Sequence, residues 1–180
     1  MKRIGNPLGV EARLKRLAQN IAGLERKDNE EIRRAAEIAE LRRRAAADLH
    51  CVCKGFVHAV AGHLPDPREL RLDPQEFSED DFSEYGTHLF QLGIRGRILQ
   101  IEFASTSELL CEDDYRIPYT LAGSIRAFNQ QMLENSCIDE NQIFFTVEQK
   151  RSGWIFLDRR THRATEFDQE RLLALMESLI

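Results

Sequence analysis

The stretch Asn141–Arg159 reads NQIFFTVEQKRSGWIFLDR, and it predicts a β-hairpin. Two runs of aromatic and β-branched residues flank a polar segment with one glycine, which is a typical pattern for two strands and their turn. A three-residue loop from Arg151 to Gly153 pairs Val147 with Leu157 and keeps the apolar side chains together, because strand side chains alternate between faces. We therefore expect one buried face, formed by Phe145, Val147, Ile155 and Leu157.

The same alternation predicts an aromatic face on the other side of this hairpin. It consists of Phe144, Trp154 and Phe156. A single layer of helices covers only one face of a sheet, so these rings need a second cover. Either the N-terminal arm folds back over them or another molecule binds there, and we predict that they contribute to partner binding.

A second hairpin is predicted over Thr87–Ile94 and Arg97–Phe103, which flank the dipeptide Arg95-Gly96. Glycine readily adopts a positive φ angle, so this dipeptide suits a two-residue turn. The resulting register pairs Leu92 with Leu99, Phe90 with Ile101, and His88 with Phe103 on one face.

Two helices are predicted around the Asn141–Arg159 hairpin. Pro118 favours a first helical turn, and the residues at helical spacing after it are Leu121, Ile125, Phe128 and Met132. The last helix begins at a cap residue, either Thr165 or Asp168, and its expected buried stripe is Leu172, Leu173, Met176, Leu179 and Ile180. Residues 109–111 form either a short third strand or a loop.

These elements predict an α+β protein: a long N-terminal helical arm, then a two-layer domain with an antiparallel sheet in the order β-β-(β)-α-β-β-α. Over residues 85–180 this order resembles several two-layer α+β folds, among them the type III secretion chaperones. The resemblance concerns element order and implies an architecture alone. We expect three segments: the arm or helical hairpin over 1–63, an acidic proline-containing linker over 64–84, and the α+β domain over 85–180.

The arm carries the pattern of a short coiled coil. Val10, Leu14, Leu17, Ile21 and Leu24 alternate at spacings of four and three residues. The same register continues with Asp28 and Glu31, so the apolar seam is short. Residues 25–31 form either a turn between two helices or a bend in one helix. The arm then either packs on its own domain or pairs with a second copy.

Composition favours a non-membrane protein of the cytoplasm. Apolar residues make up 42% of the 180-residue chain, enough for a core, but no run approaches the roughly 20 residues of a membrane span. We find no secretory signal, and we expect the four cysteines to stay reduced. The net charge of −5 combines an N-terminal basic part, with a balance of +4 over residues 1–50, and an acidic remainder with −9.

Motifs for catalysis are missing from the sequence. It contains no P-loop, no Gly-x-Gly-x-x-Gly, no Gly-x-Ser-x-Gly and no His-Glu-x-x-His, which argues against an enzyme without excluding one. The best metal candidates are His50, Cys51, Cys53 and His58, but Cys51 and Cys53 point about 200° apart on a helix. We therefore predict no metal site, no cofactor and no catalytic residue.

The sequence thus favours a non-catalytic binding or adaptor protein that self-associates or binds a protein partner. The expected contact residues are those of the arm seam and the aromatic face. The alternative is a nucleic-acid-associated protein that uses basic residues, namely Arg42, Arg43 and Arg44 in the arm, with Arg159 and Arg160 after the hairpin.

Overall fold

The computed structural model describes residues 7–112, 117–129, 139–148 and 152–180. The chain divides into two compact units, Met1–Ile38 and Ala39–Ile180. Helix α1, Pro7–Ala61, contributes residues to both units. From here on, the arm means the part of α1 that lies in the first unit, residues 7–38. The second unit is called the sheet unit.

Helix α1 is continuous, so of the two alternatives for residues 25–31 the turn between two helices is wrong and one long helix is observed. Residues 25–31 contain no glycine or proline, and Glu, Arg and Lys among them are good helix formers. The next turn adds an exposed Arg33–Glu37 ion pair with a separation of 3.5 Å at helical i,i+4 spacing. The predicted long N-terminal helix is confirmed.

The sheet unit contains one antiparallel seven-stranded sheet whose strands lie in chain order. This confirms an α+β protein with an antiparallel sheet. The strands are β1 (Leu70–Asp73), β2 (Thr87–Ile94), β3 (Arg97–Ser105), β4 (Tyr119–Phe128), β5 (Asp139–Val147), β6 (Ser152–Leu157) and β7 (Ala164–Glu166). Two short 3-10 helices, Pro67–Glu69 and Glu79–Asp81, precede β2, and helix α3, Gln169–Leu179, follows β7.

The β2–β3 hairpin has the predicted register. Leu92 pairs with Leu99, Phe90 with Ile101, and His88 with Phe103. Arg95 and Gly96 form the turn with φ angles of 45° and 80°. Both central residues are therefore left-handed, which fits the twist of the flanking strands.

The β5–β6 hairpin also forms, but its predicted register is wrong. Val147 pairs with Ser152, and Phe145 pairs with Trp154. The strands are therefore joined through residues 148–151, and β6 is displaced by an odd number of residues from the expected pairing. An odd displacement moves every side chain of a strand to the opposite face. Consequently Trp154 and Phe156, rather than Ile155 and Leu157, face the core.

Strand β4 replaces the helix predicted after Pro118, and that prediction is wrong. A spacing of four residues, as between Leu121 and Ile125, fits a strand face as well as a helix face, because four is a multiple of two. Ala127 extends the buried face, while Phe128 falls on the other one. Met132 lies outside the described residues. The element order on which the resemblance to type III secretion chaperones rests is therefore not the observed order.

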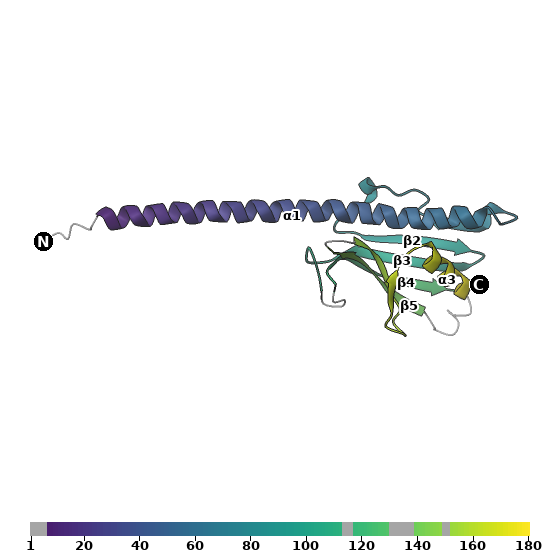
Figure 1. Ribbon diagram of the computed structural model, residues 1–180. Helices are drawn as coiled ribbons and strands as arrows, with labels where there is room; N and C mark the ends of the chain where they lie inside the picture. Colours follow the sequence, from purple (N-terminus) through teal and green to yellow (C-terminus); the bar gives the residue numbers. More distant parts are fainter. Residues whose placement is uncertain (1–6, 113–116, 130–138, 149–151) are drawn as a thin grey trace. The chain divides into compact units, whose positions relative to one another are not determined.

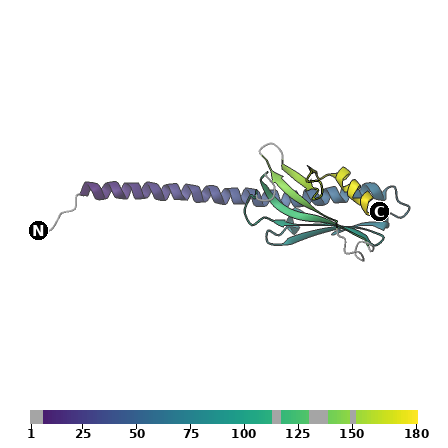
Figure 2. The ribbon, with the colours of Figure 1, turned by 90° about the horizontal axis from the view of Figure 1, so that it is seen from below.

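The core lies on the face of the sheet that α1 and α3 both cover (Figures 1 and 2). From α1 it receives Ala45, Ala46, Leu49, Cys53 and Phe56. Asp168 caps α3 and accepts a hydrogen bond from the Arg171 amide at 2.9 Å, whereas Thr165 lies in β7. Of the stripe predicted on α3, Leu172, Met176 and Leu179 are buried, but Leu173 and Ile180 are exposed.

The segment between α1 and β2 is predicted to be a linker, but part of it belongs to the sheet and the core. It contains β1, whose Leu70 and Leu72 are buried. Phe77 and Phe82 pack against the core cluster and hold this segment to the sheet unit. The acidic stretch between them holds the second 3-10 helix, where Ser78 and Asp81 form a capping box.

Candidate interaction site on helix α1

The arm presents an exposed apolar stripe, which we call the seam. Its members are more than half exposed: Val10 54%, Leu14 61%, Leu17 55%, Ile21 57% and Leu24 59%. At about 1.5 Å of rise per residue, the seam is roughly 21 Å long. Solvent exposure of five large apolar side chains along one stripe is characteristic of an interaction surface.

The seam has the heptad geometry of a coiled coil. The three-residue steps assign Leu14 and Ile21 to position a, and Val10, Leu17 and Leu24 to position d. Charged residues flank it on both sides. Glu11 and Glu25 occupy e positions, and the g positions hold Arg13, Lys27 and Arg34. Asp28 and Glu31 fall on the next a and d positions, so the apolar stripe ends after Leu24.

The C-terminal part of α1 behaves differently, because its apolar face is buried inside the sheet unit. Ala45, Ala46 and Leu49 are at most 1% exposed. Two consecutive alanines allow the helix backbone to approach the sheet, and the Trp154 indole donates a hydrogen bond to the Ala45 carbonyl at 2.8 Å. This part of α1 packs on its own domain, whereas the seam residues are exposed.

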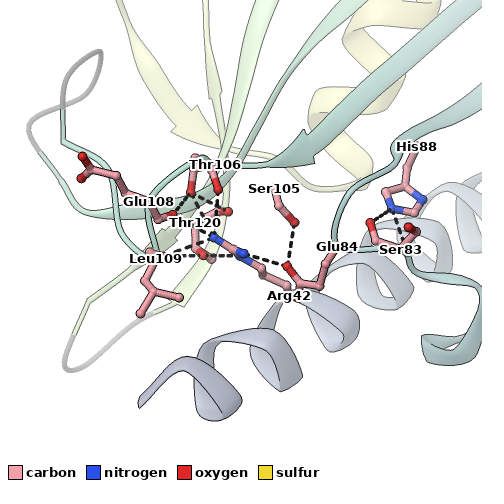
Figure 3. A network of polar contacts seen from close by, with 9 residues as sticks. All are labelled: Arg42, Ser83, Glu84, His88, Ser105, Thr106, Glu108, Leu109 and Thr120. Carbon is pink, nitrogen blue, oxygen red and sulfur yellow. Dashed lines mark hydrogen bonds and ion pairs between the residues drawn. The ribbon is translucent and has the colours of Figure 1, made fainter. Parts of the chain in front are cut away.

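Arg42 anchors α1 to the sheet unit through a buried polar network (Figure 3). Its Nε donates to the Thr120 hydroxyl and its Nη1 to the Glu84 carboxylate, both at 2.7 Å. Its Nη2 donates to the Glu108 carbonyl at 2.9 Å. The side chain is 7% exposed, so the predicted role of Arg42 in phosphate binding does not fit its position.

The acceptors of Arg42 are held by further hydrogen bonds. The Ser105 hydroxyl donates to Glu84 at 3.1 Å, and the Thr120 hydroxyl donates to the Leu109 carbonyl at 2.8 Å. The other Glu84 oxygen, Oε1, is buried and has no hydrogen-bond partner among the residues that the structure describes. The network therefore connects α1, the segment before β2, and the chain between β3 and β4.

The remaining arginines of the nucleic-acid alternative are exposed or half-buried. Arg43 and Arg44 both donate to Glu40, and these hydrogen bonds lower the pKa of that carboxyl. Arg159 lies 3.8 Å from Glu140, and Arg160 is exposed. Carboxylate partners reduce the positive charge that these side chains offer to a phosphate.

The three residues of the predicted aromatic face do not form one. Trp154 packs edge-on against Phe103 and Phe145 with ring centroids 5.2 and 5.5 Å away, and the Arg171 guanidinium lies 5.1 Å from the Phe156 ring centroid. Phe144 does lie on the other side of the sheet. There it is 2% exposed, and its ring centroid is 4.8 Å from that of Tyr119. All three are buried, and the shifted β5–β6 register explains the error.

The histidine and cysteine residues of α1 do not assemble. His50 is buried and hydrogen-bonds the Pro74 carbonyl at 2.9 Å, while Cys51 and His58 are exposed. Burial raises the pKa of the Cys53 thiol to about 12. Within the described ranges, no group of three or more His, Cys, Asp or Glu side chains is arranged to hold a metal ion.

Across the described part of the chain, no helix is both long and apolar enough to cross a membrane. The chain matches no protein-family model, no curated protein and no solved structure.

Proposed function

We propose that this protein is a non-catalytic binding module that self-associates through the seam of helix α1. The observation that carries the proposal is the exposure of Val10, Leu14, Leu17, Ile21 and Leu24 on one helical stripe. Burial of such side chains releases roughly 1.5–3 kcal/mol for each one that is fully removed from water. A protein with this stripe in water therefore gains free energy when another surface covers it.

The width of the seam favours another helix as its cover. A helix that packs on a globular core has a stripe of three or four apolar residues per two turns, whereas a coiled-coil seam has only positions a and d. The seam has this narrower pattern over about two heptads, short of the three to four typical of long coiled coils. We therefore expect reversible association that depends on protein concentration.

In this proposal the sheet unit holds the C-terminal part of helix α1. Its arginine network stabilises the attachment of α1, and its aromatic residues fill the core. Self-association of the arm would bring two sheet units into one assembly. A partner with two binding sites for the sheet unit could then bind both copies at once. Such bivalency raises apparent affinity without any new contact.

Sedimentation equilibrium of the full chain over a wide concentration range tests the proposal. The natural protein is expected to show a dimer that dissociates on dilution. A Leu17→Gln, Leu24→Gln variant removes two seam side chains and should remain monomeric over the same range.

A matched control carries Ala22→Gln and Ala36→Gln, both on exposed positions of the arm outside the seam. It contains the same number of new amides and should dimerise like the natural protein. If the natural protein is monomeric at every concentration, or if both variants dimerise equally, self-association through the seam is excluded.

A further inference from the structure

We infer that two copies of the arm pair in parallel and in register, an inference that rests on the proposed self-association. The first argument is the odd number of apolar layers. From Val10 to Leu24 the seam runs d-a-d-a-d. A parallel in-register pair places each residue beside its own copy, so all five layers are apolar on both sides.

An antiparallel pair cannot match all five layers. In that orientation each a residue faces a d residue, and the seam has three d residues but only two a residues. One register places Leu14 opposite Leu24 and Leu17 opposite Ile21, which leaves Val10 facing Asp28 of the other copy. The register shifted by one heptad leaves Leu24 facing Pro7 instead. Each antiparallel arrangement therefore forfeits one apolar layer.

The flanking charges supply the second argument. In a parallel pair, each g residue faces the e residue five positions later in the other copy. These pairs are Arg13 with Ala18, Asn20 with Glu25, and Lys27 with Ile32, and none of them opposes like charges.

Antiparallel helices instead bring e against e and g against g. In the register that pairs Leu14 with Leu24, Glu11 approaches Glu25 of the other copy and Arg13 approaches Lys27. Like charges that face each other oppose association, so this register is disfavoured on both flanks.

The identities at positions a and d suit two helices in the second heptad, whereas Leu14 at a after Val10 at d does not share that preference. Ile21 at a, between Leu17 and Leu24 at d, is the combination that favours a parallel dimer over a higher oligomer. In the parallel pair Asp28 and Glu31 each face their own copy beyond the last apolar layer, and this repulsion between like charges ends the paired stretch after Leu24.

Charged substitutions of Ala18 test the orientation, because parallel and antiparallel pairs predict different changes in the dimer dissociation constant. Ala18 is an exposed e position that faces Arg13 in the parallel pair, but faces Glu11 or its own copy in the two antiparallel registers. In the parallel pair, Ala18→Glu should lower the dimer dissociation constant by roughly two- to five-fold, and Ala18→Lys should raise it by a similar factor, as expected for two exposed ion pairs. The antiparallel register in which Ala18 faces Glu11 reverses both signs. In the register in which Ala18 faces its own copy, both substitutions bring like charges together and raise the dissociation constant.

The measurement is sedimentation equilibrium of full-length variants in low salt and again in about 1 M salt, where exposed charge pairs are screened. Ala18→Gln controls for the loss of alanine, and circular dichroism confirms equal helix content. Opposite shifts of the predicted sign that disappear in high salt support the parallel pair. Reversed shifts, or equal shifts for both substitutions, overturn the orientation but leave self-association standing. A natural protein that never dimerises overturns the proposed function itself.

Discussion

Arg42 shows how a single side chain can be both charged and structural. It lies in a run of three arginines, yet it donates to acceptors from three segments that are distant in sequence. Arg43 and Arg44 beside it both donate to the carboxylate of Glu40, which lies on the same helix. The helical period explains the difference, because consecutive residues point about 100° apart and one of the three must face the sheet.

Replacement of Arg42 should destabilise the sheet unit. Arg42→Met leaves the Glu84 carboxylate and the Thr120 hydroxyl without their donor, so we expect a loss of about 2–3 kcal/mol. This lies at the lower end for a buried ion pair because the Glu84 side chain remains 28% exposed. Urea denaturation followed by circular dichroism measures the free energy of unfolding.

Arg43→Met is the matched control, since the Arg43 partner Glu40 is 38% exposed. Its effect should stay within about 0.5 kcal/mol. Equal losses for Arg42→Met and Arg43→Met would contradict the anchoring role of Arg42.

Cys53 makes a second prediction at this scale, one that concerns pH. Burial raises the pKa of its thiol from an ordinary 9.0 to about 12. Above pH 9 the unfolded chain loses this proton while the folded chain keeps it, so stability should fall as pH rises from 9 towards 12. The measurement is the urea midpoint at pH 8 and pH 10.5, with Cys53→Ala as the variant in which this contribution to the pH dependence is absent. A Cys53→Ala variant with an unchanged pH dependence would contradict the prediction.

Among the elements, β3 and β4 approach each other unusually closely at Gly123. A Cβ atom added there would lie 1.9 Å from the Glu102 carbonyl oxygen and 2.7 Å from the Phe103 Cα. Both neighbours are backbone atoms, so a rotamer change cannot relieve the contact. Glycine in a strand often marks such an approach.

Gly123→Ala should therefore separate β3 from β4 and lower the free energy of unfolding by roughly 1–3 kcal/mol. Gly153→Ala is the control, because a Cβ at Gly153 in β6 meets nothing within 4 Å. Thermal unfolding of both variants compares the two positions. A Gly123→Ala protein as stable as the Gly153→Ala protein would show that the strands separate without loss.

For the whole molecule, the boundary between units falls inside a helix rather than at its end. Residues 39–61 of α1 supply Leu49 and Phe56 to the core. A chain that begins at Ala39 should therefore unfold cooperatively, whereas one that begins at residue 64 lacks one layer of the core and should not fold. Circular dichroism melting curves distinguish the two truncations.

The chain from Ala39 should also be monomeric, because it lacks the seam. A dimer of that chain would show that self-association uses another surface.

Several features followed from local chemistry and were predictable. The Arg95-Gly96 turn determines the β2–β3 register because a two-residue loop permits only a narrow range of strand pairings. The apolar spacing and the absence of proline after the first turn specify helix α1, and Asp168 specifies the start of α3. The seam itself is a sequence pattern, and the structure adds that its residues are exposed.

Other features depended on contacts between distant parts of the chain. The sequence pattern of β6 allows Trp154 to lie on either face of the sheet. Ring packing against Phe103 and the hydrogen bond to the Ala45 carbonyl select the core face. The spacing from Leu121 to Ile125 suits a helix and a strand equally, and pairing with β3 and β5 resolved it. The burial of Arg42 likewise required partners from far along the chain. Local sequence determines the structure where a turn, a cap residue or a hydrophobic period is compatible with one conformation. Where the same pattern fits two conformations, packing against distant residues decides between them.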